Sequence, residues 1–302
     1  MDIELKRELS NWMSLEDIKE EEPMKQHTSF RVGGPAKLFL SIRSEEVLSK
    51  VLKLIKEKEI PYFILGNGSN LLVSDQGYPG VILYLEKEFS EIKVKDNYLY
   101  AGAAALLSRV SKAAMEAGLT GLEFAAGIPG SMGGGTVMNA GAYGGELGQF
   151  ITTVKAMDPE GNIVLLKKEE MEFGYRQSVF KRKSYIILEV GLELTPGNRD
   201  DILKEMMEYN RARSEKQPLE YPSAGSTFKR PEGHFAGKLI MDSGLKGYQI
   251  GGAKVSEKHC GFVINVGDAT CGDIITIMSE IQRTVMEKFQ VELEPEVIYL
   301  GE

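Results

Sequence analysis

The sequence is poor in the residues that build disulfide frameworks and metal sites. Its 302 residues include only two cysteines and three histidines. The spacing of Cys260 and Cys271 matches neither a paired-thiol redox motif nor a zinc knuckle. The composition therefore predicts a reducing compartment and no bound metal.

Long apolar runs and an excess of basic residues are also missing. The net charge is -8 at pH 7, whereas nucleic-acid binding usually needs a strongly basic domain. No apolar run approaches the roughly 20 residues of a membrane helix. The charged stretch 1–26 lacks the apolar core of a signal peptide. We expect a monomeric cytoplasmic protein that binds neither nucleic acid nor membrane.

What is present is an ordinary globular composition with interleaved strand and helix patterns. The chain is 42% apolar and 26% charged, and its length predicts about two domains of ~100–200 residues each. Period-2 and buried apolar patterns predict strands at 36–42, 61–65, 80–85, 91–95, 98–102, 151–157, 162–166, 184–194, 261–265 and 297–300. Helical spacing predicts helices from Ser44, around 106–116, up to Lys216 and around 274–289, the last capped by Thr270 and Asp273. This order indicates an α+β fold.

A polar segment rich in proline and glycine, residues 195–201, interrupts the pattern and indicates a domain boundary. The last strand is expected to pack back on the first domain. The expected division is a first domain 1–197 with lobes of about 1–86 and 87–197, a second domain 198–302, and a last strand at about 292–302.

Two glycine-bearing segments indicate a phosphate ligand: LGNGSNLLVSD (65–75) and AGIPGSMGGGTVMNAGAYG (126–144). Glycines with small polar neighbours let backbone N–H groups approach phosphate oxygens closely. Turn formation alone explains one such loop, whereas two long loops favour a diphosphate. Leu71 stands where a dinucleotide fingerprint needs glycine, which disfavours a Rossmann site for NAD.

Eight motifs in a fixed order carry a family resemblance over nearly the whole chain. They are TSFRVGGPA (28–36), LGNGSNLLVSDQG (65–77), AGIPGSMGG (126–134), MNAGAYG (138–144), FGYRQSVF (173–180), KQPLEYPSAGSTFKRP (216–231), AGKLI (236–240) and LEPEV (293–297). Together they resemble the UDP-N-acetylenolpyruvoylglucosamine reductase (MurB) family. The resemblance implies non-covalent FAD in a two-lobed domain of the vanillyl-alcohol-oxidase (PCMH) type, followed by a smaller α+β domain for the UDP-sugar. Members use NADPH to complete UDP-N-acetylmuramate, a peptidoglycan precursor.

The resemblance also places the FAD diphosphate in the two glycine loops. The expected cofactor contacts are Gly66, Asn67, Gly68, Ser69, Asn70, Gly127, Ile128, Pro129, Gly130, Gly133, Gly134, Asn139, Gly141 and Ala142. The residues themselves indicate a diphosphate, and the flavin comes from the family.

The implied substrate, UDP-N-acetylglucosamine enolpyruvate, is an enol ether that bears a carboxylate. Its reduction needs a hydride at the terminal carbon, from flavin N5, and a proton at the carbon next to the carboxylate. Negative charge then builds on the carboxylate and needs donors. By resemblance, Arg176 pairs with the carboxylate through its two-pronged guanidinium, Glu296 helps to protonate that end, and Ser226 donates the proton to carbon.

Each of these assignments has a plainer alternative. Arg176 could form a surface ion pair, Glu296 could be a charge at a strand edge, and Ser226 could only shape a turn. A serine acid also needs a dry site, and the glutamate needs surroundings that keep it partly neutral. The intact flanking motifs favour the catalytic interpretation of Ser226.

Four further residues are secondary candidates for binding the substrate. A tyrosine beside the arginine could orient the substrate or simply pack. Cations near the serine are expected to face the UDP diphosphate, with solvated surface charge as the alternative. These candidates are Tyr175, Lys216, Lys229 and Arg230.

The chain departs from the family pattern at two places. Ile298 stands where members often have arginine, which puts a second cation there in doubt. The short step from Phe180 to Tyr185 leaves no room for a tyrosine-bearing substrate loop, which indicates the shorter subclass.

Two alternative functions stay open: another flavin enzyme of the same superfamily, and a UDP-sugar-binding protein without catalysis. Bound flavin, and its reoxidation by the enolpyruvyl sugar, would separate the three.

Overall fold

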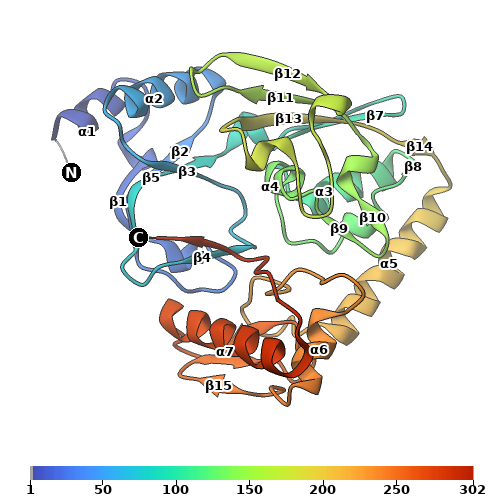
Figure 1. Cartoon of the computed structure of the whole chain (residues 1–302). Coiled ribbons are helices and arrows are strands. Elements are labelled where there is room, and N and C mark those ends of the chain that lie inside the picture. Colours follow the sequence, from blue (N-terminus) through green and yellow to red (C-terminus); the bar gives the residue numbers. More distant parts are fainter. Residues whose placement is uncertain (1–2, 302) are drawn as a thin grey trace. The chain divides into compact units, whose positions relative to one another are not determined.

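The computed structural model describes residues 3–301 and divides into two compact units (Figure 1). The chain passes between the units more than once. These compact units are defined by packing. The predicted domains, 1–197 and 198–302, were defined by the ligand that each binds, and that division stays a prediction. Unit 1 holds residues 3–20, 38–67 and 80–213, and unit 2 holds 21–37, 68–79 and 214–301.

The N-terminal sheet has the strand order β1-β2-β5-β3. β3 and β5 pair in parallel in unit 1, with Tyr62 opposite Val81. The apolar stripe of α2 is buried, and the Ser44 side chain caps the helix by accepting from the Val47 N–H. The bounds are α1 (Ile3–Leu9), β1 (Ile18–Pro23), β2 (Pro35–Ile42), α2 (Glu45–Glu57), β3 (Tyr62–Leu65) and β5 (Tyr78–Leu85).

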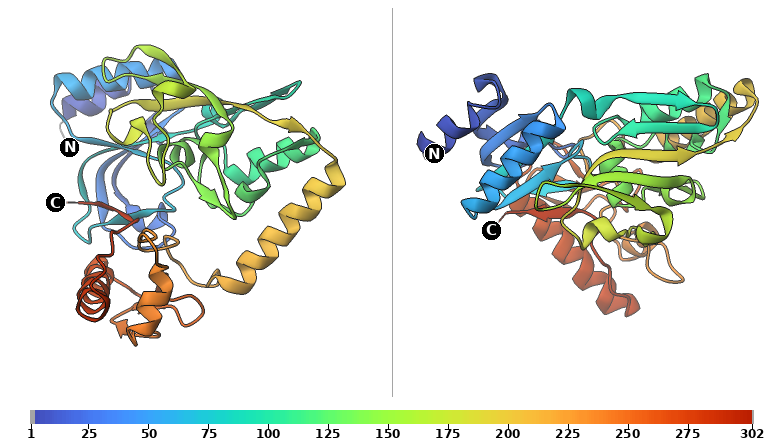
Figure 2. Two further views of the ribbon diagram at one scale, coloured as in Figure 1. Left: turned by 45° about the vertical axis from the view of Figure 1, so that its right-hand side comes forward. Right: turned by 90° about the horizontal axis from the view of Figure 1, so that it is seen from above.

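A five-stranded antiparallel sheet, ordered β12-β11-β13-β7-β6, forms the rest of unit 1. Helices α3 and α4 pack beside it, with α4 in contact with β13 and β7 (Figure 2). Leu99, Val154 and Val190 are fully buried in its core. The bounds are β6 (Ile92–Lys95), β7 (Tyr98–Gly102), α3 (Leu107–Glu116), α4 (Met132–Val137), β11 (Ile151–Met157), β12 (Ile163–Lys167) and β13 (Ile186–Glu193).

Three short elements complete the path from this sheet to the second half of the chain. β8 (Leu119–Thr120) pairs with β14 (Thr195–Pro196), and β9 (Gly141–Ala142) pairs with β10 (Gly145–Glu146). The long helix α5 (Arg199–Lys216) follows β14.

Unit 2 packs helix α7 against a three-stranded antiparallel sheet ordered β15-β16-β17. The predicted capping box is confirmed, since Thr270 accepts from the Asp273 N–H and Asp273 accepts from the Thr270 N–H. β18 pairs in parallel with β4, with Ile298 opposite Leu71. The bounds are β4 (Leu71–Val73), α6 (Ala236–Asp242), β15 (Gln249–Ile250), β16 (Ala253–Val255), β17 (Val263–Asn265), α7 (Cys271–Phe289) and β18 (Ile298–Leu300).

The predicted α+β class is confirmed, but several short elements were missed, among them α4 and β1. α4 forms inside the glycine-rich segment expected to be a loop, because Ser131 caps it and Met132 and Thr136 are buried. β1 was missed because only Ile18 of its residues is fully buried, so the strand shows no alternation. Within residues 3–301, no helix combines the length and apolar character needed to cross a membrane.

Candidate functional site

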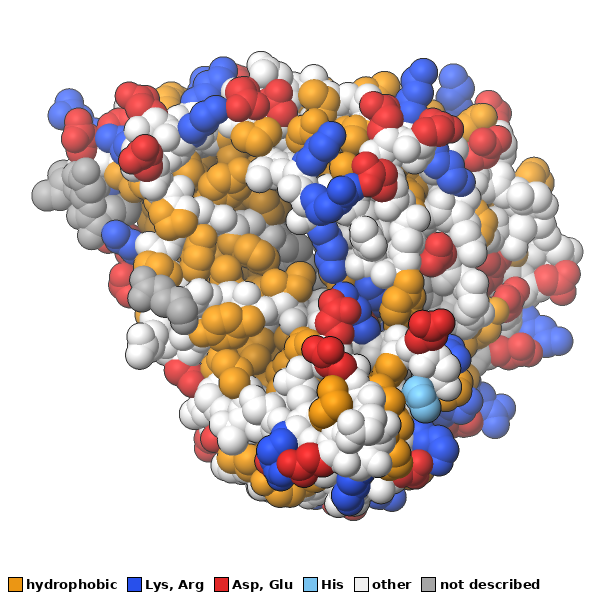
Figure 3. Space-filling model, in the orientation of Figure 1, with side chains coloured by type: hydrophobic (Ala, Val, Ile, Leu, Met, Phe, Trp, Pro, Cys, Tyr) orange, Lys and Arg blue, Asp and Glu red, His pale blue; other side chains and the backbone are white. Residues whose placement is uncertain are grey.

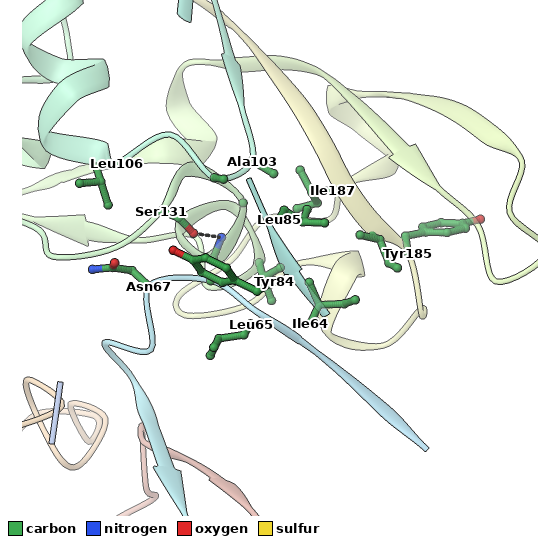
Figure 4. Close-up of a pocket in the computed structure, with 16 residues that line it drawn as sticks. Ile64, Leu65, Asn67, Tyr84, Leu85, Ala103, Leu106, Ser131, Tyr185 and Ile187 are labelled. Carbon is green, nitrogen blue, oxygen red and sulfur yellow. Dashed lines mark hydrogen bonds between the residues drawn. The ribbon is translucent and has the colours of Figure 1, made fainter. Parts of the chain in front are cut away.

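A pocket of about 120 Å³ opens in unit 1 where β3 ends and α4 begins (Figure 4). Apolar side chains form most of its wall, while the polar ends of Asn67, Ser131 and Tyr84 lie toward one side. Burial raises the pKa of Tyr84, so its hydroxyl stays protonated and can donate a hydrogen bond. The lining residues are Ile64, Leu65, Gly66, Asn67, Tyr84, Leu85, Ala103, Ala104, Leu106, Ser131, Gly133, Gly134, Val137, Tyr185, Ile186 and Ile187.

The two predicted glycine loops meet at this pocket. The Asn67 side chain donates a 2.7 Å hydrogen bond to the Pro129 carbonyl, which joins the loops directly. A Cβ at Gly66 would lie 2.7 Å from the Ser131 hydroxyl, closer than side chains normally approach. The close approach of the loops therefore depends on glycine at position 66.

The amides at the start of α4 are already used inside the protein. The Met132 and Gly133 N–H groups donate to the carbonyls of Ala105 and Ala103, at 2.7 and 2.8 Å. The Gly134 N–H donates to the capping Ser131 hydroxyl at 3.3 Å. An amide contact to a phosphate would therefore come from other residues of the two loops, while Gly133 and Gly134 line the pocket.

These residues fit a flavin dinucleotide. An apolar wall suits a flat ring system, and two glycine loops suit a diphosphate that backbone groups must approach closely. The small residues Ala103 and Ala104 keep the wall open. Sequence reasoning missed them, although the run of alanines after β7 was a readable signal for a close approach of another group.

Arg176 lies in a tight turn at the surface of unit 1. The backbones of Gly174 and Gln177 exchange two 3.1 Å hydrogen bonds, which close the turn around Tyr175 and Arg176. Arg176 has φ of 54°, a left-handed conformation that is uncommon for arginine. Its guanidinium lies 5.2 Å from the centre of the exposed Tyr175 ring. Lys and Arg side chains gather over the segment between β12 and β13 on the face drawn in Figure 3.

The MNAGAYG segment contacts this turn. Asn139 is fully buried, and its side-chain amide donates to the Gly174 carbonyl at 3.0 Å. The Arg176 guanidinium donates to the Gly141 carbonyl at 3.2 Å. Two residues predicted to touch the cofactor, Asn139 and Gly141, are thus brought to the predicted catalytic arginine.

Helix α5 supplies an arginine that sequence reasoning missed. A Cβ at Gly127 would lie 3.1 Å from the Arg213 Cδ, so the start of the second glycine loop packs on this side chain. Burial lowers the pKa of Arg213, but a guanidinium keeps its charge in proteins. Nearby, the rings of Tyr143 and Tyr209 stack at 4.5 Å. Nothing in the pattern of α5 distinguishes this arginine from its solvated neighbours.

Ser226 and Glu296 lie in unit 2, on adjacent segments joined by the Phe228–Pro295 bridge. Ser226 is exposed and follows Gly225, which has φ of 75° and open space where a Cβ would be. The Glu296 N–H donates to the Thr227 carbonyl at 2.9 Å. The fold therefore brings Ser226, the predicted proton donor, close in space to Glu296.

The first glycine loop also contributes to this region of unit 2. Gly68, with φ of 60°, packs so closely on the His27 carbonyl that no side chain fits. The Asn70 side chain donates to the Glu296 carbonyl at 2.9 Å, and the Asn70 carbonyl accepts from the Ile298 N–H. Asn70, predicted as a cofactor contact, thus holds the backbone that directly follows the Glu296 side chain, from the Glu296 carbonyl to the Ile298 N–H.

The predicted phosphate-binding cations have different surroundings. Lys229 pairs with Glu294. The Arg230 guanidinium lies 4.0 Å from the centre of the Phe235 ring. Lys216 is exposed at the end of α5. Lys229 would have to exchange its carboxylate partner for a phosphate. Among residues 3–301, no cluster of three metal-ligating side chains occurs.

Comparisons with known proteins cover both halves of the chain. Residues 36–167 match the FAD binding domain family, and residues 217–300 match the UDP-N-acetylenolpyruvoylglucosamine reductase C-terminal domain family. The UDP-N-acetylenolpyruvoylglucosamine reductase of Clostridioides difficile is 52% identical, over 97% of each chain. That of Lachnoclostridium phytofermentans is 49% identical, over 98% of this chain and 97% of the relative.

Solved structures agree with the sequence comparisons. The MurB reductase of Thermus caldophilus superposes with a TM-score of 0.81 at 36% identity, covering 94% of this chain and 98% of its own. p-Cresol methylhydroxylase shares the fold alone, with a TM-score of 0.50 at 14% identity over 64% of this chain and 43% of its own. This likeness and the match to the FAD binding domain family together confirm the predicted FAD-binding domain of the PCMH-type fold. The chain therefore belongs to the UDP-N-acetylenolpyruvoylglucosamine reductase family of FAD-dependent oxidoreductases, which act in peptidoglycan synthesis.

Proposed function

We propose that this chain uses NADPH to reduce UDP-N-acetylglucosamine enolpyruvate to UDP-N-acetylmuramate. One observation carries the proposal: two glycine loops meet at an apolar pocket, through the Asn67–Pro129 hydrogen bond, as a flavin diphosphate requires. The family relationship supports the choice of sugar substrate.

FAD, held by the two glycine loops (65–75 and 126–144), would supply the hydride for the terminal carbon of the enol ether, with NADPH as the source of that hydride. Arg176 pairs with the substrate carboxylate and stabilises the charge that builds there. Ser226 donates a proton to the carbon next to the carboxylate, which balances the hydride and completes reduction of the double bond. Glu296 helps to polarise or protonate the carboxylate end as charge builds. Because Ser226 is exposed, bound substrate must exclude water from it.

The remaining assignments follow the same model. Residues 1–197 bind FAD and 198–302 bind the UDP-sugar, with Lys216, Lys229 and Arg230 toward its diphosphate and Tyr175 beside its carboxylate. The chain works as a cytoplasmic monomer without nucleic acid. The chain is of the shorter subclass, which lacks the tyrosine-bearing substrate loop. This assignment is supported by the short connection from Phe180 to β13, which begins at Ile186.

The experiment that tests the proton donor compares two serines of one loop. Wild type, Ser226→Ala and Ser223→Ala are reduced anaerobically with NADPH and mixed with the enolpyruvyl sugar, and the flavin absorbance is followed. We expect Ser226→Ala to reoxidise about 10²- to 10⁴-fold more slowly, the range that general acids contribute, and Ser223→Ala to match wild type. Equal rates for all three would assign the proton to another group.

A further inference from the structure

Three hydrogen bonds tie the second glycine loop to the turn that carries Arg176. They involve alternate residues of the segment 137–141, which lies along the turn. The pairs are Ser178 Oγ to the Val137 carbonyl at 2.7 Å, Asn139 Nδ2 to the Gly174 carbonyl at 3.0 Å, and the Arg176 guanidinium to the Gly141 carbonyl at 3.2 Å.

Asn139 is the central contact, and both ends of its amide are held by backbone. Its Oδ1 accepts from the Gly148 N–H at 2.8 Å, while its Nδ2 donates to Gly174. The residue has no exposed surface, so its side chain offers none to a ligand. Its φ of 42° is left-handed, which indicates that the surrounding contacts impose this conformation.

The Gly174 carbonyl accepts two hydrogen bonds, one from the Asn139 side chain and one from the Gln177 N–H that closes the turn. A turn with a left-handed arginine is strained by itself, because such a backbone conformation costs free energy. The contact from Asn139 therefore holds the residue at which the turn begins, and with it the direction of the Arg176 side chain.

We propose that Asn139 is a positioning residue for Arg176 and not a ligand of the flavin. Asn139 fixes the turn so that the guanidinium stays where the substrate carboxylate binds. This inference rests on the carboxylate-binding role of Arg176 in the proposed function. It divides the second glycine loop into residues 127–134, which line or adjoin the pocket, and residues 139–141, which hold the catalytic turn, while Val137 belongs to both.

The first variant to test is Asn139→Asp in the holoenzyme. It keeps the shape and the acceptor for the Gly148 N–H, but it replaces the donor to Gly174 with a carboxylate oxygen. Displacement of a reacting group by about 1 Å can cost roughly 10²-fold in rate, so we expect reoxidation by the enolpyruvyl sugar to slow by about 10- to 100-fold. The Kd for FAD should not change, and flavin reduction by NADPH should change far less.

A double-mutant cycle with Arg176→Ala distinguishes positioning from a general structural effect. If Asn139 acts through Arg176, Asn139→Asp slows reoxidation in the wild-type background and adds little in the Arg176→Ala background. An equal slowing in both backgrounds, or weaker FAD binding by Asn139→Asp, overturns the inference and leaves the proposed function standing. If Arg176→Ala reoxidises like wild type, the proposed role of Arg176 fails and the inference fails with it.

Two further variants keep the test decisive. Ser111→Ala is the control: it removes another buried hydrogen bond of unit 1, the 2.7 Å bond that the Ser111 hydroxyl donates to the Leu122 carbonyl. It should leave flavin reduction by NADPH and flavin reoxidation by the enolpyruvyl sugar unchanged. If Asn139→Asp does not fold, Asn139→Gly replaces it, since glycine suits the left-handed backbone and removes the same donor. The same slowing and the same loss of effect without Arg176 are expected, and a normal reoxidation rate in Asn139→Gly would refute the inference.

Discussion

The substitution Gly66→Ala tests whether the meeting of the two glycine loops holds the flavin. The added Cβ would lie 2.7 Å from the Ser131 hydroxyl, where ordinary van der Waals contact begins at about 3.4 Å. Gly66 has no left-handed backbone, so the methyl group acts through this contact and not through strain at its own position. Either the loops move apart or Ser131 rotates away.

Both responses have a calculable cost. Forcing a methyl group into a packed site costs about 1–3 kcal/mol. Rotating Ser131 loses the cap on the Gly134 N–H, worth about 1 kcal/mol. If the two loops of the variant move apart in the apoprotein, part of the free energy of FAD binding is needed to bring them together again. A cost of about 2 kcal/mol then weakens FAD binding by roughly 30-fold, since 1.4 kcal/mol corresponds to tenfold.

The assay is a titration of apoprotein with FAD, followed by quenching of flavin fluorescence, together with a thermal melt of the apoprotein. The matched control is Gly272→Ala in α7, where the nearest atoms would lie at 3.6 and 3.7 Å. We expect the control to bind FAD like wild type. If Gly66→Ala binds FAD with wild-type affinity and its apoprotein melts at the wild-type temperature, the loops do not depend on each other in the way described.

Three further predictions concern unit 2. Asp75→Ala should lower the stability by about 1 kcal/mol, seen as a fall in the melting temperature, because the carboxylate accepts from two amides at the start of α7 at 2.8 and 3.0 Å; an unchanged melt would contradict this. Cys260 and Cys271 should react slowly with a thiol reagent at pH 8, because both are buried, and burial raises the pKa of both thiols, that of Cys271 to about 12; rapid labelling of the native protein would refute the burial. Asn70→Ala should slow reoxidation by the enolpyruvyl sugar, since it removes the donor to the Glu296 carbonyl; a wild-type rate would show that the glutamate needs no such support.

Local signals predicted local structure well. The cap and apolar stripe of α7 lie within the helix itself, and both were observed as expected. By contrast, α4 is rich in glycine, a poor helix former. It exists because of the Ser131 cap and buried neighbours that the local pattern does not reveal.

The composition of the units depends on contacts distant in sequence. Residues 68–79 belong with the C-terminal part because Asp75 binds the start of α7 and β4 pairs with β18. Neither contact can be predicted from the residues next to it in the sequence. The candidate residues were predictable as a set from motifs, whereas their separate tasks were not, since the hydrogen bonds of Asn70 and Asn139 are visible only in three dimensions.

The most direct test of the account is one anaerobic mixing experiment with the wild-type protein. The flavin is first reduced with NADPH, and UDP-N-acetylglucosamine enolpyruvate is then added while oxygen is excluded. The account predicts that the oxidised flavin band returns rapidly and that UDP-N-acetylmuramate forms in equal amount. A flavin that stays reduced until oxygen is admitted would contradict it and would assign the chain another substrate.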